Sequence, residues 1–176
     1  TAVKDRGLKN IPTTADALPI FNDDKIINLF ESTGVLSPVE LASRYEVYSE
    51  QYVLSIEVEA KLTIDMAKTM IYPAAIRYLS DLSMTNAGMS EMGIDMDNSV
   101  AQKVADEANA MMASVSKLSD AMAKEDFAST DEHMLFCANE IRALMDEVRV
   151  HADTLEQEVS DELWPLPKYQ EMLFIK

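Results

Sequence analysis

The chain has 176 residues, and its 15 lysines and arginines against 31 aspartates and glutamates give a formal net charge of −16. Because basic side chains that neutralise phosphates supply most nucleic-acid affinity, this balance argues against nucleic acid and against an anionic membrane surface as partners. A chain of this length can bury a core without disulfides, so one domain, or one domain with a small annex, is expected.

The single cysteine, Cys137, excludes an internal disulfide and gives no sign of an oxidising compartment, so a cytoplasmic setting is expected. The first thirty residues contain no continuous apolar segment of the signal-peptide type. The longest apolar run, 70–76, is far shorter than the roughly 20 residues that span a bilayer. The opening residues from Thr1 predict a piece of a longer polypeptide.

Glycine is scarce, at four residues, and most of the six prolines lie near predicted element ends, which is typical of long helices. The sequence therefore predicts an all-α fold. Segment 4–19 has two prolines and no sustained period, so it is predicted to be an extended linker without a core of its own.

Two helix starts are marked by capping residues. A short first helix is predicted to begin at Asn22 or Asp23 and to end at Gly34, which can take the left-handed C-terminal position. A second helix is predicted to begin at Ser37, with Pro38 at its first position and Glu40 closing a capping box.

This second helix is predicted to be very long. Its apolar residues recur at intervals of three and four as far as the region of Gly88, about 49 residues or roughly 70 Å. Pro73 removes one backbone hydrogen bond and clashes with the preceding turn, so a kink between Thr69 and Pro73 is expected, with a complete break as the alternative. The predicted buried face consists of Leu41, Tyr45, Tyr48, Tyr52, Ile56, Ala60, Ile64, Ala67, Ile71, Ala75, Tyr78 and Leu82.

Two further helices follow the connection 89–97. The third is predicted to end near Lys124, and the fourth to begin at Ser129 or Thr130. Short turns make these helices antiparallel neighbours, so the fold is predicted to be an antiparallel bundle with a short N-terminal helix and an extended apolar tail as accessories. The apolar stripes are Val100, Val104, Ala108, Met111, Val115, Leu118 and Met122, and then Met134, Ala138, Ile141, Met145, Val148, Ala152, Leu155 and Val159.

The residues show no active site. Neither His133 nor His151 completes a Glu-x-x-His motif, so a di-iron site of the bundle type is not expected. His133 lies one turn before Cys137 and could activate a thiolate, but one helix supplies no oxyanion hole, so core packing of Cys137 is favoured. Glu147 and His151 are expected to form a solvated pair. The glycines lie too far apart for a phosphate loop.

Two groups of side chains leave a choice between binding and packing. The twelve methionines could form an adaptable peptide-binding groove, although core filling is favoured. Tyr45, Tyr48 and Tyr52 could stack on a ligand, although at helical spacing an aromatic stripe is usually part of a core.

Several segments resemble the C-terminal region of type III glutamine synthetases. They are SRYE at 43–46, EQY at 50–52, EVEA at 57–60, PAAIRY at 73–78 and the tail from Leu163 to Ile175. The resemblance implies a parent enzyme that makes glutamine from glutamate, ammonia and ATP with Mg or Mn, in large homo-oligomers. It assigns no catalytic, cofactor or metal residue to this chain.

The predicted elements divide the chain into a linker (1–21), a helical bundle (22–162) and a docking tail (163–176), and the resemblance implies that the linker comes from an upstream catalytic domain. The chain is then expected to be a non-catalytic assembly domain that contacts its own catalytic domain and neighbouring subunits. The candidate contact residues are Tyr45, Tyr48, Tyr52, Trp164, Leu166, Leu173 and Phe174. The alternatives are a stand-alone helical scaffold or adaptor that binds a partner helix, and a small enzyme that uses Cys137 with His133.

Overall fold

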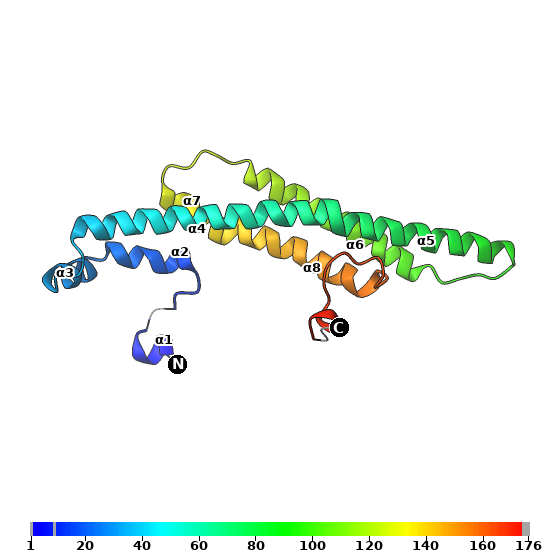
Figure 1. Cartoon of the computed structure of the whole chain (residues 1–176), viewed down its shortest axis with the longest axis horizontal. Coiled ribbons are helices and arrows are strands. Elements are labelled where there is room, and N and C mark those ends of the chain that lie inside the picture. Colours follow the sequence, from blue (N-terminus) through cyan, green and yellow to red (C-terminus); the bar gives the residue numbers. More distant parts are fainter. Residues whose placement is uncertain (1, 9, 174–176) are drawn as a thin grey trace. The chain divides into compact units, whose positions relative to one another are not determined.

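The computed structural model describes residues 2–8 and 10–173, and all regular secondary structure in these ranges is helical, as predicted (Figure 1). In chain order the elements are α1 (Ala2–Arg6), α2 (Thr14–Ala17), the 3₁₀ helix η1 (Leu18–Asn22), α3 (Asp24–Ser32), α4 (Pro38–Met66), the π-helical turn η2 (Ala67–Ile71), α5 (Tyr72–Glu91), α6 (Ser99–Met122), α7 (Thr130–Phe136), the π-helical turn η3 (Cys137–Ile141), α8 (Arg142–Glu158) and α9 (Tyr169–Leu173).

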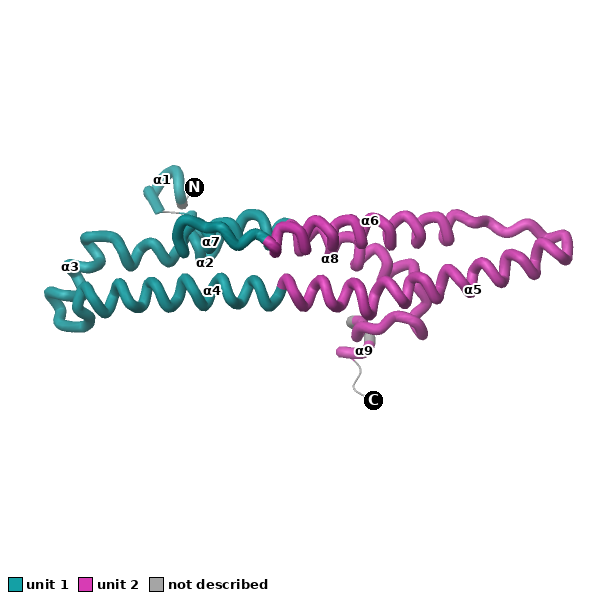
Figure 2. The backbone as a smooth tube through the Cα atoms, turned by 90° about the horizontal axis from the view of Figure 1, so that it is seen from above, with its two compact units in different colours: residues 1–59, 124–143 teal, residues 60–123, 144–176 magenta. Residues whose placement is uncertain are grey.

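The chain forms two compact units (Figure 2). Unit 1 comprises residues 1–59 and 124–143, and unit 2 comprises residues 60–123 and 144–176. The domain boundaries expected after residues 21 and 162 stay a prediction.

The prediction of an extended linker over 4–19 is wrong, because α1, α2 and the start of η1 lie within this segment. Thr13 caps α2 by accepting a hydrogen bond from the Asp16 amide, and Ala15 and Leu18 are buried in unit 1. Helices of four or five residues are too short to show a hydrophobic period, which explains why the pattern gave no signal. The tail is not wholly extended either, since it contains α9.

Both predicted helix starts are confirmed in unit 1. Asp23 caps α3 by accepting a hydrogen bond from the Lys25 amide, and Gly34 lies beyond that helix with a φ of 67°. The Ser37 amide and hydroxyl donate to Glu40 Oε2 at 2.8 and 2.7 Å, and the Glu40 amide donates to Ser37 Oγ at 3.3 Å. These are the reciprocal bonds of a capping box. They hold the pKa of Glu40 below its ordinary value.

Helical structure continues without a break from Pro38 to Glu91, so the alternative of a broken helix is wrong (Figure 1). The π-helical turn η2 lies directly before Pro73, where the distortion was predicted. In this turn the Tyr72 amide donates to the Ala67 carbonyl, five residues back. The wider turn gives the proline ring room at the point where a regular α-helix would place a carbonyl against it.

The buried face of α4 differs from the predicted one at Tyr48, which is 39% exposed. Ser49 and Val53 are buried instead, in line with Leu41 and Ile56. Tyr48 lies one residue off this line, and its ring contacts Phe21 of η1 at a centroid distance of 6.0 Å.

The core of unit 2 lies where α6 packs against α5 and α8. The α6 stripe is confirmed from Val104 to Leu118, with Val104, Met111 and Leu118 completely buried, but the predicted first member, Val100, is 39% exposed at the start of the helix. Three ion pairs join α6 to α8: Lys103 with Glu158 at 2.5 Å, Glu107 with His151 at 2.7 Å, and Lys117 with Glu147 at 3.3 Å. The residue numbers rise along α6 as they fall along α8, so these two helices are antiparallel. The predicted pair of Glu147 with His151 is therefore wrong, because both side chains turn to α6.

We expect Leu118→Ala to lower the free energy of unfolding by about 2–5 kcal/mol, because it leaves a cavity in the fully buried core of unit 2. The control Met84→Ala, at a position that is 64% exposed, should change it by no more than about 0.5 kcal/mol. Urea denaturation followed by circular dichroism measures both values. Equal effects of the two substitutions would contradict the assigned core.

We expect the Glu40 carboxyl of the folded chain to titrate below its ordinary pKa of 4.5. Ser37→Ala should raise that pKa only part of the way to the ordinary value, because the variant loses the Ser37 hydroxyl but keeps the backbone amide, whose hydrogen bond lowers the pKa most. Since the folded pKa is the lower one, the stabilisation is present above the unfolded pKa and is lost as the pH falls through the folded pKa. Carbon-detected NMR titration of the side-chain carboxyl measures this. An unchanged Glu40 titration in the Ser37 variant would argue against the capping box.

Candidate functional site

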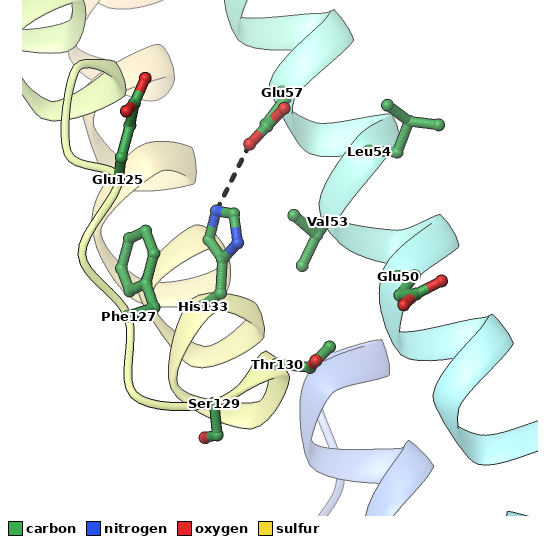
Figure 3. Close-up of a pocket in the computed structure, with 9 residues that line it drawn as sticks. All are labelled: Glu50, Val53, Leu54, Glu57, Glu125, Phe127, Ser129, Thr130 and His133. Atoms are coloured by element: carbon green, nitrogen blue, oxygen red, sulfur yellow. Dashed lines mark ion pairs between the residues drawn. The ribbon is translucent and has the colours of Figure 1, made fainter.

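The N-terminus of α7 positions His133 against α4 in unit 1. Ser129 caps α7 by accepting a hydrogen bond from the Glu132 amide, which fixes the start of the helix and directs His133 towards α4. The His133 Nε2 atom lies 3.4 Å from Glu57 Oε1, and the two side chains point towards each other (Figure 3). Both side chains are about 28–29% exposed, so this pair is partly shielded from water.

An aromatic cluster holds the other side of His133. The Phe127 ring stacks on the imidazole with a centroid distance of 4.1 Å and an interplanar angle of 9°. The Lys124 ammonium lies 4.8 Å from the Phe127 centroid and 4.7 Å from that of Phe136. Such stacking and cation–π contacts order the segment that leads into α7.

These groups border a pocket of about 570 Å³ between α4 and the segment before α7 (Figure 3). The lining combines carboxylates, hydroxyls, an imidazole and apolar side chains: Glu50, Val53, Leu54, Glu57, Glu125, Phe127, Ser129, Thr130 and His133. The pocket contains no lysine or arginine among these residues, so its electrostatic field favours a cation over an anion.

Cys137 is not activated by His133. The thiol is 1% exposed, and burial, followed by the nearby Glu57 carboxylate, raises its pKa to about 11. A thiol with this pKa is almost entirely protonated near neutral pH and is a poor nucleophile. His133 is paired with Glu57, so the structure places Cys137 in the core of unit 1 and supports the packing interpretation.

The three candidate contact tyrosines lie on α4 of unit 1. The Tyr45 hydroxyl donates to Asp131 Oδ1 at 2.5 Å, and burial together with this carboxylate raises the pKa of Tyr45 to about 12. Tyr48 is exposed beside Phe21. Tyr52 is half-buried, and its buried hydroxyl has no hydrogen-bond partner among the described residues.

The other candidates belong to the tail, in unit 2. Trp164 and Leu166 are half-buried, and the buried Trp164 Nε1 has no hydrogen-bond partner within the part of the chain that the structure describes. Leu173 is 72% exposed at the end of α9. Phe174 lies outside the described residues. The candidates therefore belong to two groups, the tyrosines of α4 in unit 1 and the residues of the tail in unit 2.

Sequence reasoning missed the pocket itself, and in particular Glu57, Glu125 and Phe127. The two sides of the pocket come from segments about seventy residues apart, and no short motif links them.

In the ranges 2–8 and 10–173, no group of three or more histidine, cysteine, aspartate or glutamate side chains could hold a metal ion. Within the same described residues, no helix is both long and apolar enough to cross a membrane.

Residues 1–90 match the family described as glutamine synthetase C-terminal domain. The chain is 36% identical over 183 residues to the type-3 glutamine synthetase of Dictyostelium discoideum, an alignment that covers 98% of the chain and 25% of that protein. It is 28% identical, over 97% of the chain, to a glutamine synthetase of Bacteroides fragilis (strain YCH46). It is 30% identical, over 96% of the chain, to a glutamine synthetase of Butyrivibrio fibrisolvens. These matches confirm the resemblance seen in the sequence. The chain spans about a quarter of the length of these curated relatives.

We expect Cys137 to react with a thiol reagent far more slowly in the folded chain than in the chain unfolded in urea. The rise in its pKa from the ordinary 9.0 to about 11 alone reduces the thiolate fraction about 100-fold, and burial slows the reaction further. The matched control carries Asn139→Cys with Cys137→Ser, which places the thiol at an exposed position two residues further along the same helical turn. Equally fast labelling of both folded proteins would contradict the buried, protonated thiol.

Proposed function

Since the chain belongs to the glutamine synthetase C-terminal domain family, we propose that it is the helical assembly domain of a longer enzyme that makes glutamine from glutamate, ammonia and ATP. In this proposal the chain holds together parts of the enzyme and supplies no group that touches the reacting atoms. The catalytic centre, with ATP and Mg or Mn, lies in the remainder of the enzyme, which we place in the cytoplasm.

The observation that carries the assembly role is the exposed apolar surface at the end of the tail. Met172 and Leu173 of α9 are 59% and 72% exposed, and the Trp164 indole N–H nearby in sequence is buried without a partner among the described residues. Adjacent large apolar side chains and an unsatisfied indole donor are features that a docking partner would cover. Segment 163–176 is therefore proposed as a docking tail.

We place the helical bundle at residues 22–162. Tyr45, Tyr48 and Tyr52 of α4 are proposed as a second contact region, on this bundle. Tyr48 offers an exposed ring and Tyr52 a hydroxyl without a partner among the described residues, whereas the hydroxyl of Tyr45 is already bound to Asp131. Segment 1–21 is proposed to connect the bundle to an upstream catalytic domain. The proposed contact set remains Tyr45, Tyr48, Tyr52, Trp164, Leu166, Leu173 and Phe174.

A divalent metal ion takes several carboxylate or imidazole ligands that converge on one point. The described residues contain no such group, so no catalytic step is assigned to this chain through a metal.

One observation favours the alternative of a helical scaffold that binds a partner helix. Met84, Met92 and Met96 are 64%, 66% and 45% exposed around the connection between α5 and α6 in unit 2. Flexible thioether side chains on a surface adapt to apolar partners. In this alternative the chain would bind its partner at that end of unit 2.

We expect Met172→Ser with Leu173→Ser to weaken the oligomer of the full-length enzyme, because these substitutions remove exposed apolar side chains from the docking tail without altering a buried core. Deletion of 163–176 should have a larger effect in the same direction. Mass photometry over a dilution series measures the oligomer, and glutamine formation measures the activity.

The control for this experiment is Val150→Ser, which changes a side chain of similar exposure (62%) on α8. It should leave the oligomer unchanged. If the tail variants kept both the oligomer mass and the activity of the unaltered enzyme, the proposed docking role of the tail would be wrong.

A further inference from the structure

We propose that a face of unit 1 binds a segment that is both apolar and basic, with a lysine or arginine side chain of that segment entering the pocket beside His133. This proposal rests on the proposed function, because the segment is assigned to the remainder of the glutamine synthetase polypeptide. We call this surface the acid–apolar face. It consists of Val47, Glu50, Leu54, Glu57 and Val58 of α4 together with Glu125.

The acid–apolar face presents large apolar side chains to solvent. Val47, Leu54 and Val58 are 54%, 61% and 55% exposed, and their spacing of seven and four residues places them on one side of α4. The buried face of α4 is formed by a different set of residues. These three side chains therefore form a second stripe that the described residues of unit 1 leave uncovered, which is typical of a surface that binds a partner.

Charge determines which partner fits this stripe. Acidic residues outnumber basic ones in both segments that form this face. Residues 44–61 contain Glu46, Glu50, Glu57 and Glu59 against Arg44 and Lys61, and residues 124–132 contain Glu125, Asp126, Asp131 and Glu132 against Lys124. The closest basic residue in sequence to the second group, Lys124, has its ammonium over the Phe127 and Phe136 rings. The field of this face therefore attracts a cationic partner.

The same charges argue against a second copy of this chain as the occupant. A chain of net charge −16 would bring a second acidic surface against the acid–apolar face. Like charges placed opposite each other across an interface oppose association. A basic segment of the same enzyme meets no such repulsion.

The pocket provides an anchor of the right chemistry for one basic side chain. Val53, Leu54 and Phe127 supply apolar contacts for an aliphatic stem, and Glu50, Glu57 and Glu125 supply carboxylates for the charged head group. Leu54 belongs both to the pocket and to the exposed stripe, so the anchor and the stripe are continuous. Charge-assisted hydrogen bonds to a guanidinium or ammonium group are among the stronger polar contacts in proteins.

The test uses the full-length enzyme with a photo-crosslinking amino acid, p-benzoylphenylalanine, at position 51. Gln51 is exposed and lies between Val47 and Leu54, so Gln51→p-benzoylphenylalanine samples the acid–apolar face without removing any of its residues. The same amino acid at Val150, which is 62% exposed on α8, serves as the control site. Mass spectrometry identifies the crosslinked peptides. We expect position 51 to crosslink to a segment outside these 176 residues that contains apolar residues and at least one lysine or arginine.

The charge requirement is tested by adding E50Q with E125Q to the crosslinking variant. These changes should lower the crosslink yield at position 51 roughly tenfold, because the carboxylates that bind the basic side chain are neutralised. The matched control, D120N with D146N, removes the same charge from exposed positions of unit 2 and should leave the yield unchanged.

The remaining outcomes each overturn the proposal. A crosslink to a second copy of residues 1–176, or to a peptide without a basic residue, would contradict the assigned partner. A yield at position 51 no higher than at position 150 would contradict a covered face. If the tail variants still weakened the oligomer, the assembly role would stand and only the acid–apolar face would be wrong. If the native polypeptide were no longer than this chain, both proposals would fail.

Discussion

The fold of this chain depends on the burial of apolar side chains that recur at intervals of three and four residues along helices. In unit 2 this constraint brings α6 against α8, where Met111, Leu118 and Leu155 are completely buried. Burial of each such side chain contributes about 1.5–3 kcal/mol, more than the facing ion pairs at partly exposed positions can supply. The apolar stripes therefore hold these helices together, and the ion pairs lie at the edge of the packed surface.

Much of the fold could be predicted because its signals are local. The caps at Asp23 and Ser37 and the α6 stripe from Val104 to Leu118 each follow from a few neighbouring residues, and the structure has them where the sequence predicts them. Pro73 marked a distortion, but its form could not be predicted, because a π-helical turn and a break satisfy the same steric constraint. The second π-helical turn, at 137–141, contains no proline, so no residue of this segment marks it in the sequence.

The candidate site was much less predictable, because it is made of contacts between distant segments. His151 was expected to pair with Glu147 on its own helix, yet it pairs with Glu107 on α6. His133 lies one turn before Cys137 in the sequence, but its side chain pairs with Glu57 and stacks on Phe127, and neither partner could be identified from spacing. Spacing within one helix cannot show which side chains a second helix will present.

The most direct test of the account is the size and activity of the native polypeptide. An antibody against this domain would detect the polypeptide in a lysate of the source cells, and the captured material would be assayed for ATP-dependent glutamine formation. The account predicts a polypeptide about four times as long as this chain, since the chain covers 25% of its relatives, and it predicts that activity. A native polypeptide no larger than 176 residues, without that activity, would contradict it.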